Sequence, residues 1–247
     1  IIGAGAGVAI IDGNQIDRVF HILSGADVTI EALTITGGKS PQGEHGGGIL
    51  NDGDLFLNGV SVTGNSTTNG RTGNISAQLT NGGSGGGIAN FGSLFVNSGS
   101  DNSGNSTSRG GHAGFTGQRG GHGGNGGGIY NSSIFRVLYS TISNNTTGEV
   151  GLGTLCNCNG GHSGHGGGIF SDSGQLFVAN STISNNVAGP GGEVGTSPGD
   201  TGDGVDSGGI WNNGFSRIFH ATIIGNRTGS RGNKRGIGSF GQDGRRG

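Results

Sequence analysis

The chain is poor in charge, in proline and in long apolar runs, and each shortage excludes a class of protein. Charged residues make up 11% of its 247 residues, and 13 Lys or Arg are balanced by 15 Asp or Glu, so no basic field is present for binding nucleic acid. No run of 18 apolar residues occurs, so we expect no transmembrane segment. Only 3 residues are Pro, which excludes a collagen triple helix.

Glycine is the residue present in excess, at 63 of 247 positions. Such a content is typical of low-complexity or disordered segments. Two observations oppose disorder here: the formal net charge is only −2, and the apolar residues recur at fixed positions. A solenoid needs only a thin apolar row in each coil, because each repeat contacts only its neighbours.

A period of about 40 residues organises the sequence. Triplets of small residues end at Gly48, Gly87, Gly128, Gly168 and Gly209, in steps of 39, 41, 40 and 41 residues. Three short stretches with alternating apolar residues follow each triplet, and no helical period is present. We therefore predict an all-β solenoid with three strands in each coil, whose stacked coils form three parallel sheets around a narrow core.

The apolar positions should form inward columns, because residues two apart on a strand share a face. The residue after each triplet gives the column Ile49, Ile88, Ile129, Ile169 and Ile210. We predict one domain over 1–247, with opening coils at 1–45, repeats at 46–226 and a Gly/Arg-rich tail at 227–247. The second and fourth repeats carry one extra residue, and we expect a bulge in each.

Asparagine recurs at two positions of the repeat, at the end of the first strand and at the end of the third. A side-chain amide both donates and accepts, so amides stacked one coil apart can form a hydrogen-bonded ladder. Asn also tolerates the left-handed backbone of a sharp corner. We interpret both columns as structural ladders. The first is Asn51, Asn90, Asn131 and Asn212, with Ser171 in the fourth repeat, and the second is Asn65, Asn105, Asn145, Asn186 and Asn226.

The motif Gly-Gly-Gly-Ile, Leu-Phe-Val and Ser-Thr-Ile-Ser-Asn-Asn, seen in full at 166–186, resembles the right-handed parallel β-helix repeats of the pectin-lyase-like superfamily. More narrowly, it resembles bacterial surface proteins with polymorphic-outer-membrane-protein-type repeats, in which a Gly-Gly-small-aliphatic motif pairs with a downstream motif ending in Asn. The resemblance covers about half of each period. It implies a right-handed parallel β-helix, in a superfamily that includes polysaccharide lyases, adhesins and structural fibres.

Long glycine-rich insertions separate the coils and lie outside the resemblance. Glycines recur every third residue in them, as from Gly111 to Gly126. Three is the period of the polyproline-II helix, and Gly at every third position permits close lateral packing of such helices. We hypothesise that the insertions stack as a polyglycine-II-like layer, and flexible loops are the alternative.

Cys156 and Cys158 lie in one insertion, with His162 and His165 close behind. These ligand types suit zinc or copper, but their spacing matches no standard site. In an exported protein two cysteines more often form a disulfide, so we take a possible Cys156–Cys158 disulfide over free thiols and over a metal site. We expect no metal and no cofactor.

Two outward columns were considered as binding surfaces. Tyr130, Phe170 and Trp211 share one column beside the inward isoleucines, where we expect them to pack against the insertions, and binding of sugar or of a neighbouring subunit is the alternative. Thr and Ser flank the inward residue of the third strand, as in Thr141-Ile142-Ser143. Flat threonine arrays on β-solenoids resemble those of ice-binding proteins, and ice binding is a minor alternative, although Thr is also a common strand residue.

The acidic residues do not align in the columns that a polysaccharide lyase or glycosidase would need, so we expect no enzyme. Neither Ile1 nor Gly247 resembles a polar cap, and open solenoid ends need one. We therefore expect an extracellular or cell-surface structural or adhesive solenoid that self-associates end to end into fibres, cut from a longer exported chain. The alternative is an exoprotein that binds or cleaves carbohydrate, with a glycan as partner.

Overall fold

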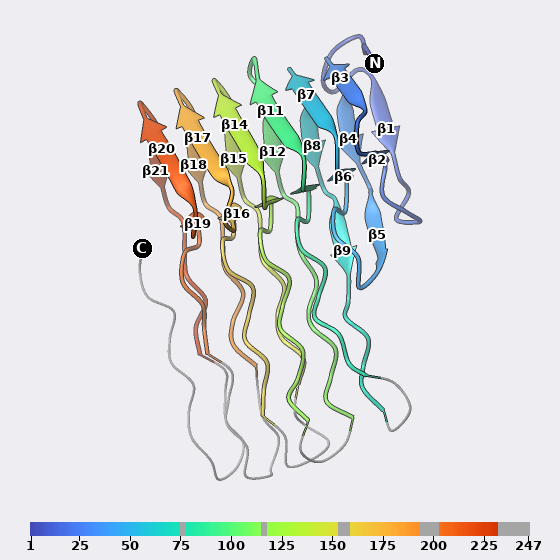
Figure 1. Cartoon of the computed structure of the whole chain (residues 1–247), viewed down its shortest axis with the longest axis vertical. Helices are drawn as coiled ribbons and strands as arrows, with labels where there is room; N and C mark the ends of the chain where they lie inside the picture. Colours follow the sequence, from blue (N-terminus) through green and yellow to red (C-terminus); the bar gives the residue numbers. More distant parts are fainter. Residues whose placement is uncertain (75–77, 115–117, 153–158, 193–202, 232–247) are drawn as a thin grey trace.

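The computed structural model describes residues 1–74, 78–114, 118–152, 159–192 and 203–231. Within these ranges the fold is all-β and contains no α-helix, and the described residues offer no helix that could span a bilayer. Every strand pair is parallel, and successive coils lie side by side along the molecule (Figure 1). The expected β-solenoid is confirmed.

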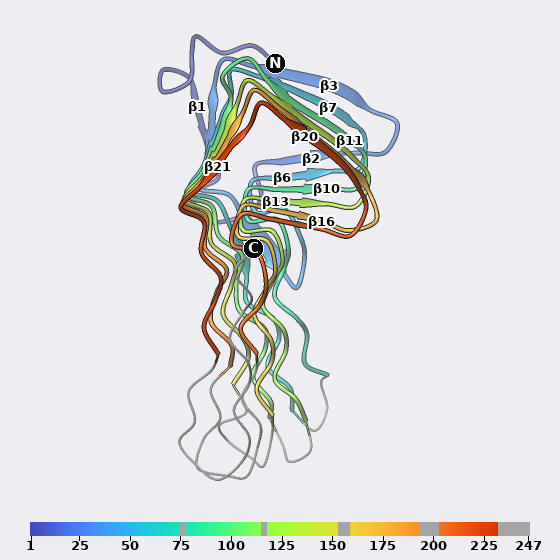
Figure 2. The same ribbon diagram turned by 90° about the vertical axis from the view of Figure 1, so that its left-hand side faces the viewer.

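Three sheets form the three sides of a triangle when the coils are viewed one behind another (Figure 2). We name each sheet by its first strand. The β1 sheet contains β1 (Ile10–Asp12), β4 (Thr34–Thr36), β8 (Ser61–Thr63), β12 (Asp101–Ser103), β15 (Thr141–Ser143), β18 (Thr182–Ser184) and β21 (Thr222–Ile224). The β2 sheet contains β2 (Phe20–Ile22), β6 (Ile49–Asn51), β10 (Ile88–Asn90), β13 (Ile129–Asn131), β16 (Ile169–Ser171) and β19 (Ile210–Asn212). The β3 sheet contains β3 (Asp27–Glu31), β7 (Asp54–Asn58), β11 (Ser93–Asn97), β14 (Ile134–Leu138), β17 (Gln175–Ala179) and β20 (Phe215–Phe219), while β5 (Lys39–Gln42) pairs with β9 (Ser66–Thr68).

The core is a set of apolar columns that run along the solenoid. Ile49, Ile88, Ile129 and Ile169 occupy one register position of the β2 sheet, and each is 0% exposed. Full burial of such a side chain stabilises the fold by about 1.5–3 kcal/mol. In the corresponding column of the β1 sheet the inward residue of β12 is Asn102, which is buried between apolar neighbours.

The extra residue of the second and fourth repeats does not make a bulge, and that expectation is wrong. Pairing of β11 with β7 is continuous over five positions, and so is pairing of β17 with β14. The additional residues lie in the turns instead, where Ser98 has a φ of 58° and Ser173 a φ of 55°. A turn absorbs an insertion without breaking the ladder hydrogen bonds, which a bulge would disrupt.

The described parts of the glycine-rich segments extend together from the side between the β1 and β2 sheets (Figure 2). Backbone hydrogen bonds join the two arms of one segment, as from Gly121 N–H to Gly111 O at 2.8 Å. Others join successive segments, as from Gly151 N–H to Gly121 O at 2.9 Å. A Cβ built on Gly151 would lie 1.8 Å from the oxygen of Gly111, so this approach requires glycine. The tips of the segments lie outside the described residues, and the polyglycine-II-like layer stays a prediction.

Candidate functional site

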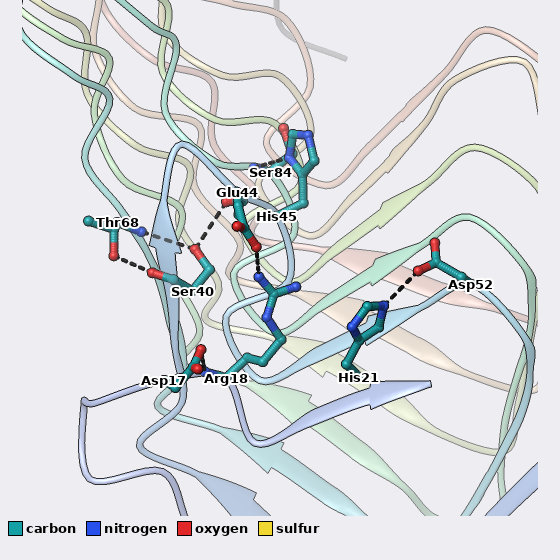
Figure 3. A network of polar contacts seen from close by, with 9 residues as sticks. All are labelled: Asp17, Arg18, His21, Ser40, Glu44, His45, Asp52, Thr68 and Ser84. Atoms are coloured by element: carbon teal, nitrogen blue, oxygen red, sulfur yellow. Dashed lines mark hydrogen bonds and ion pairs between the residues drawn. The ribbon is translucent and has the colours of Figure 1, made fainter. Parts of the chain in front are cut away.

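A column of polar side chains lies where each glycine-rich segment returns to the β2 sheet. It contains His45, Ser84, Asn125, His165 and Asp206. The residue after each member has a positive φ, between 64° and 71°, which makes the tight corner before the next strand. Ser84 N–H donates to His45 Nδ1 at 3.0 Å (Figure 3). Asn125 N–H likewise donates to Ser84 Oγ at 3.1 Å, and His165 N–H donates to Asn125 Oδ1 at 2.8 Å.

A second column stands on the returning arms of the glycine-rich segments and contains Asn81, His122, His162 and Asp203. His122 N–H donates to Asn81 Oδ1 at 2.9 Å, and His162 N–H donates to His122 Nδ1 at 3.1 Å. Asp203 N–H donates to His162 Nδ1 at 3.1 Å. The rings of His122 and His162 stack with centroids 5.1 Å apart and planes 7° from parallel. Each side chain thus accepts a backbone N–H from the next coil.

Both columns line one groove of about 600 Å³ that crosses several coils. Its walls carry imidazole, amide, hydroxyl and carboxylate groups, and Val205 is the aliphatic side chain among the residues that line it. His45 and His122 accept at Nδ1, and as neutral rings they carry their proton on Nε2. His162 differs, because its Nε2 lies 2.5 Å from Arg119 Nη2 and a guanidinium can only donate. The groove therefore offers both donors and acceptors at intervals of about 4.8 Å, the spacing of neighbouring coils.

Burial lowers the pKa of the histidines in this groove below the ordinary value of 6.5. For His45 burial is the main cause, with the Arg18 charge adding to it. For His122 and His162 burial again comes first, and the nearby Arg119 charge lowers the pKa further. For His165 burial outweighs the opposing effect of the Asp206 carboxylate. All four pKa shifts favour the neutral rings that the Nδ1 hydrogen bonds of His45, His122 and His162 require.

The outward aromatic column of the β2 sheet lies beside the groove. Phe170 and Trp211 stack with centroids 4.3 Å apart and planes 4° from parallel, and Tyr130 stacks on Phe170 at 5.5 Å. The ring of His165, which lines the groove, has its centroid 5.6 Å from that of Trp211. His45 occupies the equivalent place beside Tyr130, with centroids 6.0 Å apart.

The first asparagine column forms side-chain bonds between coils over most of its length. Asn51 Nδ2 donates to Asn90 Oδ1 at 2.7 Å, and Asn90 Nδ2 donates to Asn131 Oδ1 at 2.7 Å. Asn131 Nδ2 then donates to Ser171 Oγ at 3.1 Å. At the last described coil, Asn212 Nδ2 bonds instead to its own turn, at Gly214 O.

The second asparagine column runs from Asn65 through Asn105, Asn145 and Asn186 to Asn226. Each Nδ2 donates to the Oδ1 of the next coil, at distances from 2.9 to 3.1 Å. The same Oδ1 also accepts the backbone N–H of the preceding Asn, at 3.0 Å in every coil. These bonds supply buried backbone donors with acceptors at the corner where the chain leaves the β1 sheet.

Further polar contacts at the first coils lie near His45 (Figure 3). Arg18 forms an ion pair with Glu44, the residue before His45. His21 Nε2 lies 2.8 Å from Asp52 Oδ2, and His21 occupies the outward register column of the β2 sheet that continues to Tyr130. Ser40 Oγ donates to Glu44 O at 3.0 Å and so fixes the short first loop.

The described residues include no group of three or more His, Cys, Asp or Glu arranged to hold a metal ion. Cys156 and Cys158 lie outside the described residues, so their disulfide stays a prediction. The column of Asn81, His122 and His162 was missed from the sequence, although its members stand 41 and 40 residues apart, which is the repeat period. The sequence interpretation treated His122 as a surface group and His162 as a candidate zinc or copper ligand beside Cys156 and Cys158.

No family model, no curated protein and no solved structure matches the chain. Its assignment as a parallel β-solenoid therefore rests on its own strand pairing and register, and not on likeness to a known protein.

Proposed function

We propose that the chain is an extracellular or cell-surface β-solenoid with a structural or adhesive role and no catalytic activity, which assembles by end-to-end stacking of coils. The resemblance of its repeat to bacterial surface proteins and to the pectin-lyase-like β-helices supports that location and role. The observation that carries the proposal is the apolar surface presented by the last described coil.

At this surface the apolar core columns reach the last described coil, and their final side chains are exposed to solvent. Ile218 is 42% exposed and Ile223 is 50% exposed, whereas their partners one coil earlier, Val178 and Ile183, are 0% exposed. Ile210 joins them around a hollow of about 870 Å³. Covering each side chain would contribute about 1.5–3 kcal/mol, so another coil placed here gains several kcal/mol.

The first coil offers apolar residues at the same register positions. Ile11 heads the β1-sheet column and Phe20 the β2-sheet column, and neither β1 nor β2 has a further strand beside it among the described residues. The third edge is partly covered, because Gly3 N–H donates to Glu31 O at 2.8 Å. Stacking the last coil of one copy on the first coil of the next is a heterologous contact, and such a contact propagates without closing.

Electron microscopy of the pure chain tests this proposal. We expect rods of one solenoid width in the unchanged protein, and short particles in Ile223→Arg, because a buried unpaired guanidinium opposes stacking. Thr146→Arg, which adds the same charge at an exposed site, is the matched control and should leave the rods intact. Rods that persist in Ile223→Arg would show that assembly uses another surface.

A second candidate function is carbohydrate binding, which the polar groove and its neighbouring Trp211 favour. Sugars are bound by side chains that alternate as donors and acceptors, and aromatic rings supply an apolar face. Glycan-array binding that is lost in His122→Ala together with His162→Ala, in a protein that still folds, would support this function. Absence of binding to any glycan would exclude it.

A further inference from the structure

The outer face of the β3 sheet carries a column that combines aromatic and basic side chains. Strand register places one residue of each coil in it, and from β7 to β17 the inward neighbours on either side of these residues belong to the core. We call it the Phe–Arg column, and it runs Thr29, Phe56, Phe95, Arg136, Phe177 and Arg217. It lies on the upper side of the triangle in Figure 2, away from the glycine-rich segments.

Side chains in the middle of this column contact one another, its arginines are exposed and its phenylalanines are partly exposed. Phe56 and Phe95 stack with centroids 4.7 Å apart, and the guanidinium carbon of Arg136 lies 5.3 Å from the centroid of Phe95. Arg217 lies 5.5 Å from the centroid of Phe215, which is 60% exposed. Within the described part of the chain, neither arginine has an ion pair, so both charges are available to a partner.

Charge is segregated along this face. The acidic residues Asp27, Glu31 and Asp54 belong to the first two strands, β3 and β7. The basic residues Arg136 and Arg217 belong to β14 and β20, near the other end. A surface that is acidic at one end and basic at the other complements a second copy of itself when the copy is reversed.

We propose that this face is a homodimer interface in which two copies pack sheet against sheet with antiparallel solenoid axes. A two-fold axis parallel to the strands reverses the coil order and sets the Phe–Arg column against itself. Phe56 then lies opposite Phe177, and Phe95 lies opposite Arg136. Each of these pairs is a favourable aromatic or cation–π contact.

The same rotation places Arg217 opposite Thr29, whose strand neighbours on the outer face are Asp27 and Glu31. Each arginine of the last strand therefore meets two carboxylates of the other copy, and the symmetry makes this contact twice. With parallel axes, by contrast, Arg136 would meet Arg136 and Arg217 would meet Arg217. Like charges in direct opposition are destabilising, so the antiparallel arrangement is selected.

The size of the face sets the strength of this association. Strands of five residues span roughly 16 Å, and six strands span roughly 24 Å, which gives about 400 Å² on each copy. A stable dimer buries about 800 Å² on each partner, so we expect a weak, concentration-dependent dimer. This lateral contact uses none of the apolar surface at the last coil. The dimer and end-to-end stacking can therefore be tested separately, and either can be wrong without the other.

Sedimentation analysis of the full chain tests the proposal, in an Ile223→Arg background that blocks end-to-end stacking. Between about 10 µM and 1 mM we expect a monomer–dimer equilibrium that weakens as salt is added. Arg217→Glu, and separately Asp27→Lys with Glu31→Lys, should each weaken dimerisation by about tenfold or more, because each places like charges in contact twice. Arg71→Glu makes the same charge change at an exposed site away from the sheet and should have no effect.

Mixing the two charge-reversed variants is the decisive step. In the mixed dimer every reversed charge again meets an opposite charge. The affinity of dimerisation should therefore return to that of the Ile223→Arg protein without the charge reversals. A chain that stays monomeric at about 1 mM overturns the proposal, and so does a mixture that fails to recover. If the chain instead binds polygalacturonate through Arg217 without self-associating, the face belongs to an acidic glycan and the homodimer is wrong.

Discussion

Removing one side chain from the middle of the second asparagine ladder should destabilise the solenoid far more than its size suggests. Asn145 is fully buried. Its Oδ1 accepts from the N–H of Asn105 at 3.0 Å, and its Nδ2 donates to Asn102 O at 2.9 Å and to Asn186 Oδ1 at 3.0 Å. Asn145 Oδ1 also accepts from Asn105 Nδ2 at 3.1 Å, so Asn145→Ala takes away four contacts and leaves a buried backbone N–H at Asn105 without its acceptor.

The magnitude follows from the groups left behind. A buried donor or acceptor without a partner costs about 1–3 kcal/mol. The N–H of Asn105 and the C=O of Asn102 each lose a bond, while Asn186 Oδ1 keeps the backbone N–H of Asn145 at 3.0 Å. We therefore expect a loss of about 2–4 kcal/mol in the free energy of unfolding. The loss should raise the exchange rate of the Asn105 amide roughly 30- to 900-fold.

Hydrogen exchange and urea unfolding measure this loss locally and globally. Thr146→Ala removes an exposed side chain from the adjacent position and should change stability by no more than about 0.5 kcal/mol. Asn226→Ala, at the partly exposed end of the same ladder, should lie between the two. Equal stabilities for Asn145→Ala and Thr146→Ala would refute the view that this ladder satisfies buried backbone groups.

The remaining predictions concern the groove, the core and the corners. The lowered pKa values of His122 and His162 mean that the unfolded chain binds more protons below about pH 6.5, so the melting temperature should fall as pH drops from 7.5 to 5. Replacing both histidines with Asn, which keeps an acceptor as Asn81 does, should reduce this fall in the same thermal scan. Asn102→Val should raise the free energy of unfolding in urea by about 1–3 kcal/mol, because Asn102 Nδ2 is buried without a partner in an apolar column. Gly127→Ala should lower it by about 1–3 kcal/mol, because the added Cβ would lie 2.4 Å from Gly167 O.

The fold followed from the sequence because its signal is repeated. One alternating strand is ambiguous, but the same inward isoleucine at 49, 88, 129, 169 and 210 fixes the period and the register together. The extra residues at Ser98 and Ser173 were misplaced because spacing alone does not tell a bulge from a longer turn. The inward position of Asn102 could not be predicted, because Asn is polar and only the strand register shows that it points into the core.

Less of the candidate site could be predicted from the sequence. The groove lies between the returning glycine-rich arms and the β2 sheet, and no residue pattern in the sequence specifies how far apart these two parts lie. The histidines at 122 and 162 carry the repeat period, yet their role comes from ring nitrogens that accept backbone N–H groups, which sequence does not show. The Phe–Arg column was overlooked because outward positions vary in type from coil to coil, and its combination of aromatic and basic residues is seen only once the register aligns them.

Small-angle X-ray scattering of the pure chain over a concentration series is the most direct test of end-to-end assembly. It separates the cross-section of a particle from its length. In Arg217→Glu protein, in which the lateral dimer is weakened, end-to-end assembly predicts that particle length grows with concentration while the cross-section stays that of one solenoid, and that adding Ile223→Arg abolishes the growth. A particle of fixed length at every concentration, or a cross-section that grows while the length does not, would contradict it.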